Sequence, residues 1–587
     1  MKLFERLPAL GKTFHPETMV SRLVSHFVTE NENLLGNETA TMIMGALRAR
    51  DLDKAVSLAA SVPFQQYGTW QDHLAMNQLS LLIRKVPWTI PGLDTEANAW
   101  AKFCHAQHRC RRLNQRFFAE RVASREPYAV YRARARKWIA KVIGETPDLQ
   151  AIYEQSDYPS GAVVGIGGSD TSFYRKLSAP SISTTPSARS HFINAIWSHD
   201  QLRELYCPSQ GGIACVDPLQ FTEELSRRMK NVDYNEIFMV PKDSDCDRTA
   251  AKEPLANSFL QKGVDNYLKK KLRRVGLDLT RQEPNQRLAY AGSVECYNPF
   301  VTIDLTSASD SISIGLARDL LPPDWFVFLN QIRSPAHSYK GVTHRNAMFC
   351  TMGNGFCFPL ETLIFASLIE AAYVDTGDKT YRVFGDDIIV RQSSALLVLE
   401  LLRWAGFKMN KKKTFIFGPF RESCGADWYR GVNVHPYALD YLPSRASDLC
   451  RIHNGLQYND NVARRSSVTM SFIRREIAGY PVAPQGWVDV GNYAHQALVV
   501  PMDVFMGAPS ARWCRSTQTW TWSEVDLQGI AINPEGFSAP IYMYGLLRGS
   551  RPSSYRPKGF SLKSGDVDKW SHLPGATLRR KTRLRVT

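Results

Sequence analysis

The residues with the clearest chemical potential are two adjacent aspartates, Asp386 and Asp387, which follow Gly385 between two apolar runs. Apolar runs on either side of a short glycine-containing segment predict a β-hairpin that displays both carboxylates at its tip. Neighbouring carboxylates repel each other, and hard divalent cations prefer oxygen ligands of this kind. The pair therefore indicates a metal site, with an exposed turn as the alternative for so short a motif.

A third aspartate, Asp304, ends the strand-like run Cys296–Ile303 and precedes a polar segment. If this strand lies beside the hairpin, Asp304 joins Asp386 and Asp387 around one site. Three such carboxylates can hold two Mg²⁺ ions about 4 Å apart, the arrangement used for in-line displacement at phosphate. One ion would activate a 3′-hydroxyl, and the other would bind a nucleoside triphosphate and stabilise the leaving pyrophosphate. Mg²⁺ is thus the predicted cofactor, with Mn²⁺ as a substitute.

Cations that could bind a triphosphate stand on both sides of these acids in the sequence. Lys242 and Arg248 lie in the turn-rich stretch Val240–Pro254, where both could reach phosphate oxygens. A lysine of Asn410–Thr414, for which we select Lys412, could protonate the leaving pyrophosphate as a general acid. Ordinary surface charge is the alternative for both groups.

Three residues with small or polar side chains, Gly353, Asn354 and Gly355, precede a run with helical apolar spacing at 356–372. Glycines on both sides of an asparagine can let the backbone approach a ligand closely. This segment could therefore bind the ribose 2′-hydroxyl that distinguishes RNA from DNA substrates. A simple helix-entry turn is the alternative.

The charge balance favours a polyanionic partner, since 72 Lys+Arg against 56 Asp+Glu leave a net charge of +16. Either nucleic acid or an anionic membrane would satisfy it. Arg134 and Lys137 lie in a basic helical stretch, Tyr131–Lys141, for which RNA contact and a solvated face are equal interpretations. For the basic end, Leu578–Thr587, we favour a disordered solubilising tail over an RNA anchor.

Targeting signals are not evident in the sequence. Met1–Ser21 lacks the continuous apolar stretch of a signal peptide, and we find no run of about 20 apolar residues that could cross a bilayer. The eleven cysteines are scattered and form no paired CxxC motifs, which is typical of reduced cytosolic thiols. We therefore predict a cytoplasmic protein without a membrane partner.

With these pieces in order, the sequence closely resembles the replicase β subunit of Q-beta-type RNA bacteriophages, the leviviruses. The match covers roughly Lys137–Val434. It rests on local signatures in the same order as the polymerase motifs of that family: Val240–Pro254, Asp304–Ser313, Met352–Gly355, Gly385–Ile389, Gly406–Phe415 and Gly418–Gly425.

The resemblance implies an RNA-directed RNA polymerase that copies single-stranded RNA without a primer. It implies Mg²⁺ ligation by Asp304, Asp386 and Asp387 and a nucleotide-binding role for Asp310, which stands six residues after Asp304. Lys413 and Arg421, within the last two signatures, become candidate RNA-binding residues. The residue before Gly385 is Phe384 rather than the usual Tyr, from which we expect little effect on metal binding.

The implied fold is α+β, a right-handed polymerase with fingers, palm and thumb, an antiparallel palm sheet and mainly helical flanking regions. We expect residues 1–140 to form a mainly helical region that packs on the fingers. The remaining boundaries are 141–295 for the fingers, 296–315 and 376–434 for the palm, 316–375 for a helical fingers/palm segment, and 435–587 for the thumb and a C-terminal region with a basic tail.

Members of that family work with host proteins, so the resemblance also implies elongation factors Tu and Ts and a small-subunit ribosomal RNA-binding protein as partners. Template RNA and ribonucleoside triphosphates would be the substrates, and the cytoplasm of an infected bacterium the location. Two alternatives stay open: a reverse transcriptase would use the same carboxylates, and a non-catalytic basic RNA-binding protein would explain the net charge.

Overall fold

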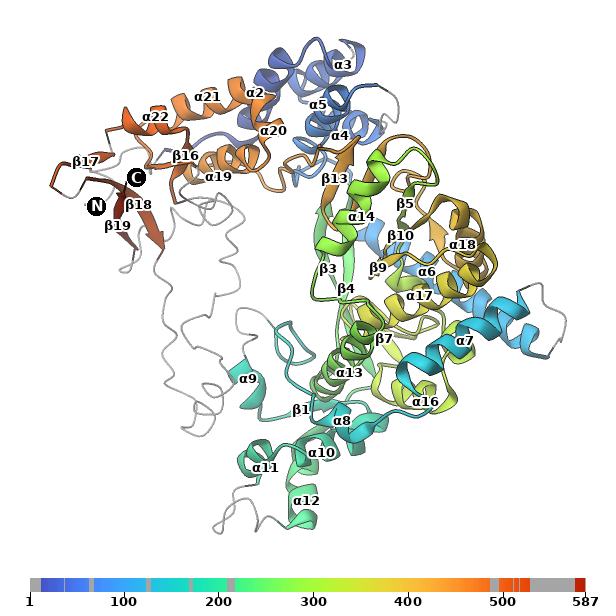
Figure 1. Cartoon of the computed structure of the whole chain (residues 1–587). Coiled ribbons are helices and arrows are strands. Elements are labelled where there is room, and N and C mark those ends of the chain that lie inside the picture. The colour runs from blue at the N-terminus through green and yellow to red at the C-terminus, as the bar shows by residue number, and fades with distance from the viewer. Residues whose placement is uncertain are drawn as a thin grey trace.

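The structure is a computed structural model that describes residues 12–35, 37–62, 68–122, 128–167, 171, 173–207, 217–485, 496–509, 511–516, 518–527 and 576–585. Within these residues the chain forms helices and small, mostly antiparallel sheets, which confirms the predicted α+β class. Most of the segment examined for a signal peptide, residues 1–11, lies outside the described part. Figure 1 shows two bodies, one above the other, joined along one side.

The sheet that carries the aspartates has the strand order β5-β10-β9 and is antiparallel throughout. Its strands are β5 (Phe300–Ile303), β9 (Arg382–Phe384) and β10 (Asp387–Arg391). Ile388 of β10 lies opposite Ile303 of β5, while Asp387 pairs with Phe384 across the hairpin. The predicted hairpin and the predicted neighbouring strand are therefore both confirmed.

Helices cover both faces of this sheet, because β5 is buried along its whole length and carries apolar side chains on both sides. Val301, Ile303 and Val390 belong to the large core on one face, against α17 and α18. Phe300 and Ile389 pack on the other face with Ala289 of α14.

We call the part of the chain built around this large core, from Leu113 to Phe407, the central body. The first half of its helices comprises α6 (Thr95–Val122), α7 (Ala129–Ile143), α8 (Leu149–Tyr153), α9 (Phe173–Leu177), η2 (Pro186–Ala188), α10 (Arg189–Trp197), α11 (Asp200–Tyr206) and α12 (Pro218–Arg228). The second half comprises α13 (Leu255–Arg274), α14 (Glu283–Val294), η4 (Ser309–Ser311), α15 (Ile314–Leu320), α16 (Pro323–Ile332), α17 (Cys357–Thr376) and α18 (Gln392–Ala405).

Helix α17 lies at the middle of the central body and is apolar on all sides. By length and composition it is apolar enough to cross a membrane, which our search of the sequence for such a run did not find. In the structure 83% of its most apolar window is buried against other parts of the protein. The helix is therefore placed as a core helix, and its polar side chains on this buried surface need a local explanation.

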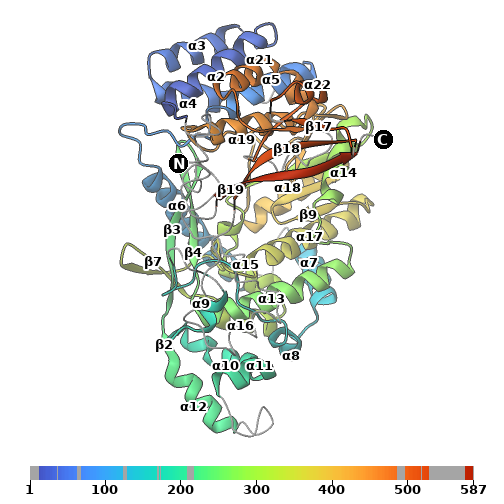
Figure 2. The same cartoon turned by 90° about the vertical axis from the view of Figure 1, so that its left-hand side faces the viewer.

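We call the β5-β10-β9 sheet the central sheet. A second sheet, with strand order β4-β3-β7-β8, stands beside it and carries the predicted triphosphate-binding cations. Its strands are β3 (Tyr234–Asp243), β4 (Cys246–Lys252), β7 (Ala336–Tyr339) and β8 (Val342–Arg345). Helix α6 packs on it through Phe103, Ala106 and Cys110, which contact Ile237 and Ala251 in a small separate core. Strands β3 and β4 form a long hairpin, whose tip reaches the helices at the top of the molecule (Figure 2).

Helices from the two ends of the chain share one hydrophobic core, and we call them together the composite body. From the N-terminal side come α2 (Pro16–Glu30), α3 (Asn37–Arg48), α4 (Leu52–Ser61) and α5 (Trp70–Leu81); from the C-terminal side come α19 (Ala446–Gln457), α20 (Asp460–Arg464), α21 (Ser467–Glu476) and α22 (Met502–Met506). Both figures show the blue and orange helices side by side at the top of the molecule.

The remaining strands form small sheets. Two of them have three strands: β12 (Phe420–Ser423), β13 (Ala426–Tyr429) and β14 (Val432–Asn433) form one, and β17 (Arg512–Cys514), β18 (Thr519–Leu527) and β19 (Ala576–Arg585) form the other. Three more have two strands each: β1 (Ile182–Thr184) with β2 (Met229–Asn231), β6 (Leu305–Thr306) with β11 (Lys408–Met409), and β15 (Val482–Pro484) with β16 (Leu498–Val500). Because β19 is a paired strand, our interpretation of the basic end as a disordered tail is wrong for the described residues there.

Two of the predicted domain boundaries need correction. The first part of residues 1–140 packs mainly on the C-terminal helices, because α2–α5 share their core with residues from 415 onward, and it contacts the segment 141–295 at the tip of the β3–β4 hairpin. Only α6 and α7 join the central body. Helix α14, which we had assigned to 141–295, packs on the central sheet and on β12 and β13.

Candidate active site

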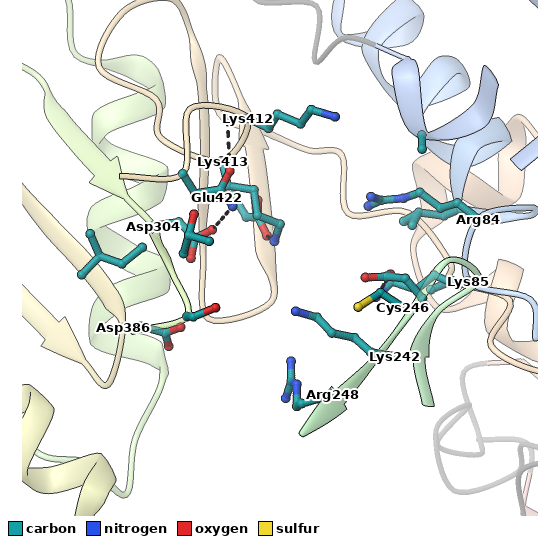
Figure 3. Close-up of a pocket in the computed structure, with 18 of the residues that line it drawn as sticks. Arg84, Lys85, Lys242, Cys246, Arg248, Asp304, Asp386, Lys412, Lys413 and Glu422 are labelled. Carbon is teal, nitrogen blue, oxygen red and sulfur yellow. Dashed lines mark hydrogen bonds and ion pairs between the residues drawn. The ribbon is translucent and has the colours of Figure 1, made fainter. Parts of the chain in front are cut away.

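A cleft of about 1500 Å³ separates the central sheet from the composite body and from the β3–β4 hairpin. Acidic side chains of the central body line one side of the cleft, which we call the acid wall: Asp304, Asp310, Glu361 and Asp386. Basic side chains, including Lys242 and Arg248, line the other. Figure 3 shows Lys242 pointing across the open space toward the side that carries Asp386, with Arg248 beside it.

The turn between β9 and β10 sets the position of Asp386. Gly385 has a φ of +62°, and a Cβ there would lie 2.2 Å from the Phe358 ring, so any larger residue would be strained and would collide. The Gly385 N–H donates to Thr362 Oγ1 of α17 at 3.0 Å. Phe384, where the resembling family has Tyr, packs edge-on against Phe358. Helix α17 thus fixes the turn, and Asp386 is left exposed at its tip.

Asp304 is held by the segment that follows α18. Its carboxylate accepts a hydrogen bond of 2.7 Å from Asn410 Nδ2, and its backbone N–H and C=O both bond Thr414 Oγ1. Burial raises the pKa of Asp304, Lys413 opposes that shift, and Asp386 adds to it. The side chain is therefore fixed and poorly compensated beside a second carboxylate.

Asp387 is less open to the cleft than we predicted. It is not among the residues that line the cavity, and its carboxylate accepts a hydrogen bond from Ser423 Oγ of β12 at 3.3 Å. Burial, followed by repulsion from Asp386, raises the pKa of Asp387 to about 6. The structure thus brings Asp304 and Asp386 together in the cleft and places Asp387 behind them.

Two further carboxylates stand beside this pair. Asp310 of η4 lines the cleft with its Oδ1 buried and without a hydrogen-bond partner among the described residues, and burial raises its pKa to about 6. Glu361 of α17 accepts a hydrogen bond from Ser309 Oγ at 3.1 Å. Burial, followed by repulsion from Asp386, raises the pKa of Glu361 to about 8. We did not predict Glu361; an acid near the start of a mainly apolar helix was the available signal.

The donor atoms on this wall suit a hard divalent cation. Across the described residues, no three His, Cys, Asp or Glu side chains stand close enough together to form a finished metal site. The acids nevertheless raise one another's pKa, because they offer carboxylate oxygens to one region with little positive charge between them. A bound cation would relieve this repulsion, and oxygen is the ligand type that Mg²⁺ and Mn²⁺ accept.

The predicted triphosphate-binding cations Lys242 and Arg248 both line the cleft from the β3–β4 hairpin. Val240 pairs with Arg248 across the hairpin, so Lys242 and Arg248 leave its tip on the cleft side. Burial and then repulsion by Arg248 lower the pKa of Lys242. The hairpin thus holds two exposed cations opposite the acids.

The lysines after Asn410 differ from one another. Lys412 is exposed and extends away from Asp304, whereas Lys413 lies beside it (Figure 3). Lys413 forms an ion pair of 2.9 Å with Glu422. Burial would lower its pKa, but Glu422, Asp304 and Asp427 outweigh that effect and raise it. Of these lysines, Lys413 is therefore the one whose positive charge acts on Asp304.

Three of the predicted RNA-binding residues do not reach the cleft. Arg421 is only 1% exposed, and its guanidinium donates to the carbonyl oxygens of Phe300, Gly418 and Phe420. Its prediction as an RNA contact is wrong, because those backbone acceptors use its donors inside the protein. Arg134 is paired with Asp375 on α17, and Lys137 is exposed on α7; neither lines the cavity.

In the segment before α17, both glycines allow close contacts with other parts of the protein. Gly353 has a φ of +120°, and a Cβ there would lie 2.1 Å from Ala251 O of β4. Gly353 also lines the cleft, whereas Gly355 packs on Gln261 of α13 and does not, so the close approach at Gly355 is to protein. Asn354 lines the cleft, and its Oδ1 accepts the Phe356 N–H at 3.1 Å.

Comparison with known proteins identifies relatives of the whole arrangement. Residues 51–463 match the family model described as RNA replicase, beta-chain. The chain is 48% identical over 206 residues to the RNA-directed RNA polymerase beta chain of Escherichia phage MS2, which covers 35% of this chain and 37% of that protein. It is 34% identical over 371 residues to the RNA-directed RNA polymerase subunit beta of Escherichia virus Qbeta, covering 62% and 59%.

Each of these two alignments spans less than two thirds of the relative's length. Among solved structures, the BmCPV RNA-dependent RNA polymerase at elongation state aligns with a TM-score of 0.36 and 13% identity, covering 76% of this chain and 40% of that one. The family model, in contrast, covers well over half of the present sequence, including all the residues of the acid wall. The chain belongs to the RNA replicase beta-chain family.

Proposed function

We propose that the chain is an RNA-directed RNA polymerase that replicates the positive-strand RNA genome of a phage. The observation that carries the proposal is the meeting of Asp304, just after β5, and Asp386, just before the adjacent antiparallel β10, across a cleft from Lys242 and Arg248. The acids suit the reacting end of an RNA strand, and the cations suit a triphosphate.

The reaction joins the 3′-hydroxyl oxygen of the growing strand to the α-phosphorus of a ribonucleoside triphosphate. The bond from that phosphorus to the bridging oxygen breaks, pyrophosphate leaves, and the hydroxyl proton passes to solvent. Asp304 and Asp386 would hold divalent cations, Mg²⁺ or in its place Mn²⁺, with Asp387 as a further ligand. When bound there, divalent cations would supply the charge that lowers the pKa of the hydroxyl and stabilises the transferred phosphoryl group.

The other residues of the cleft have supporting tasks. Lys242 and Arg248 bind the triphosphate. Lys413, rather than the predicted Lys412, supplies the proton that pyrophosphate takes up, because Lys413 stands beside Asp304 whereas Lys412 extends away from it. Asp310 and Asn354 face the cleft from either side of the α17 entry and serve to select ribose.

The proposal extends to architecture and setting. The β3–β4 region would be the fingers, the β5-β10-β9 sheet the palm, and the C-terminal helices of the composite body the thumb. We propose initiation without a primer, elongation factors Tu and Ts and a small-subunit ribosomal RNA-binding protein as partners, and the cytoplasm of the infected bacterium as location. These extensions rest on the family membership, and the assay with and without lysate tests initiation and the need for host proteins.

The test is synthesis by the purified chain, with and without bacterial lysate, on single-stranded RNA with four ribonucleotides and Mg²⁺. Full-length complementary RNA from the wild type, and none from Asp386→Asn, is the expected result. Incorporation of deoxyribonucleotides at comparable rates would instead identify a reverse transcriptase. RNA binding without synthesis on any template, the chain's own genome included, would leave a non-catalytic binding protein and sink the proposal.

A further inference from the structure

An arginine of the composite body, Arg84, faces the acid wall from the opposite side of the cleft. It follows the end of α5, between Ile83 and Val86, which are both fully buried. The Trp88 indole N–H donates to Ile83 O at 2.9 Å and fixes this turn from behind. Figure 3 shows the Arg84 guanidinium pointing into the cleft, toward the side that carries Asp304.

The backbone of Arg84 is tied to the hairpin that carries Lys242 and Arg248. The Ser244 N–H donates to Arg84 O at 3.0 Å, and the Ser244 hydroxyl lies 2.6 Å from both Arg84 O and Val86 O. Ser244 is itself buried, at 2% exposure. Arg84 is therefore held at a fixed position relative to the two hairpin cations, although it comes from the other body.

The charge of Arg84 is uncompensated, in contrast to that of its neighbour. Lys85 forms an ion pair of 2.9 Å with Asp243. Across the described residues, the Arg84 side chain makes no hydrogen bond or ion pair, and its Nε is buried without a partner. Burying part of a guanidinium without an acceptor is costly, and its planar set of N–H donors matches the oxygens of a phosphate.

We propose that Arg84 binds a phosphate group of the nucleic-acid substrates and forms the third cation of a site with Lys242 and Arg248. The inference rests on the proposed function and adds a contact from the composite body to it. The phosphate belongs either to the triphosphate of the incoming nucleotide or to the backbone of the RNA strand. Both sources present the same oxyanion, so two measurements separate them.

The test compares Arg84→Ala with Arg84→Lys and with Lys54→Ala. Lys54 is exposed on α4 of the same body and does not line the cleft, so its removal costs one positive charge elsewhere. Arg84→Lys keeps the charge but loses the planar fork. Thermal unfolding of each variant checks that the fold is intact, and the conservative Lys variant keeps the test valid if Arg84→Ala is unstable.

The first measurement is the affinity for a short fluorescent single-stranded RNA, by anisotropy over a range of salt concentrations and without nucleotides. The second is the KM for ribonucleoside triphosphates on saturating template. A backbone contact predicts about a tenfold weaker RNA affinity for Arg84→Ala and a salt dependence lower by about one phosphate. A triphosphate contact predicts about a tenfold higher KM with RNA affinity unchanged.

Arg84→Lys should fall between wild type and Arg84→Ala, while Lys54→Ala should match the wild type. The inference is overturned if both parameters of Arg84→Ala equal those of Lys54→Ala in an active enzyme. Because RNA affinity is measured without catalysis, a wild type that synthesises nothing would overturn the proposed function. A weaker RNA affinity of Arg84→Ala in that case would still support the phosphate contact.

Discussion

The central body and the composite body differ in which parts of the sequence they join and in how they treat buried polar groups. In the central body the acids approach one another with little compensation, as the raised pKa values of Asp387 and Glu361 indicate. In the composite body, buried amides bind distant backbone: Asn31 donates to Arg465 O at 2.8 Å and Asn454 donates to Ala497 O at 2.8 Å.

The cleft therefore joins a wall of carboxylates that raise one another's pKa to a body whose buried amides are bonded to its own backbone, with Arg84, unpaired among the described residues, as a cation at its edge. The acid wall has given up stability for a place where cations and phosphates bind, as functional sites commonly do. The composite body closes the opposite side with a core drawn from both ends of the chain. Changes to the first should therefore alter activity more than stability, and changes to the second should do the reverse.

The largest expected effect is on the acid wall. Asp304→Asn and Asp386→Asn should each lower nucleotide incorporation by on the order of 10³-fold, because each removes a charged oxygen ligand from the cleft. Asp387→Asn should cost less, since that carboxylate faces Ser423 and does not line the cavity. Single-turnover incorporation on a fixed template measures all three.

The control for these acids is Asp324→Asn, an exposed acid on α16 outside the cleft, which should match the wild type. The melting temperatures of the Asp304 and Asp386 variants should stay close to that of the wild type or rise. Equal losses at all three positions would show that Asp387 turns toward the cleft during the reaction.

The next effect tests the shared core. Phe27 is fully buried in α2, which packs on α21, so Phe27→Ala should cost about 3–5 kcal/mol of stability. Hydrogen exchange should then rise both in the N-terminal helices and in residues 446–476, with little change in β5 and β10. Exchange confined to residues 16–61 would contradict a core built from both chain ends. Phe192→Ala, in the core of the central body, is the matched control.

The central sheet was open to prediction from sequence, and the composite body was not. The apolar runs around Gly385 and before Asp304 specify strands by local pattern, and a tight turn specifies their pairing. The apolar faces of α2 and α21 indicate that each helix packs on another element, but the local sequence does not indicate which element that is. Arg421 was misassigned for a similar reason, since a cation in a basic segment does not reveal backbone acceptors supplied by the neighbouring strand β5.

Site details failed where the difference is one residue along the chain. Lys412 and Lys413 are equivalent in composition, and only the ion pair with Glu422 distinguishes them. Asp386 and Asp387 are likewise identical in type, yet Asp386 is exposed in the turn while Asp387 begins β10 and bonds Ser423. Glu361 carried a usable signal, because an acid inside an apolar helix is expensive unless it has a task.

A smaller effect is that the two bodies should respond to pH in opposite directions. Burial lowers the pKa of His453 in the composite body to about 4, so the unfolded chain takes up a proton near pH 6.5 that the folded chain refuses. Its contribution is present above pH 6.5 and is lost as pH falls toward 4, on the order of 3 kcal/mol. Glu361, with a raised pKa, binds its proton better when folded, so its contribution is lost as pH rises from 4.5 toward 8.

Hydrogen exchange at several pH values, read separately for α19 and for β10, measures both slopes. His453→Gln should flatten the acid-side loss in α19, and Glu361→Gln should flatten the alkaline-side loss in β10. The same pH slope in both elements would contradict the contrast between the two walls. The experiment is done without divalent cations, because a bound cation would lower the pKa of the acids.

The smallest expected effect concerns the joint between the two walls. The Lys85–Asp243 ion pair is partly exposed, at 28% and 29%, so Lys85→Ala should cost less than about 1 kcal/mol and leave incorporation within about twofold. Ser244→Ala should cost somewhat more, about 1 kcal/mol, because it removes a buried hydroxyl donor while the carbonyl oxygens of Arg84 and Val86 keep the backbone N–H groups of Ser244 and Trp88. Urea unfolding and single-turnover incorporation measure both quantities. If Lys85→Ala lowered stability more than Ser244→Ala, the ion pair and not the buried hydroxyl would hold the hairpin to the composite body. Added salt, which screens ion pairs, should then weaken this joint.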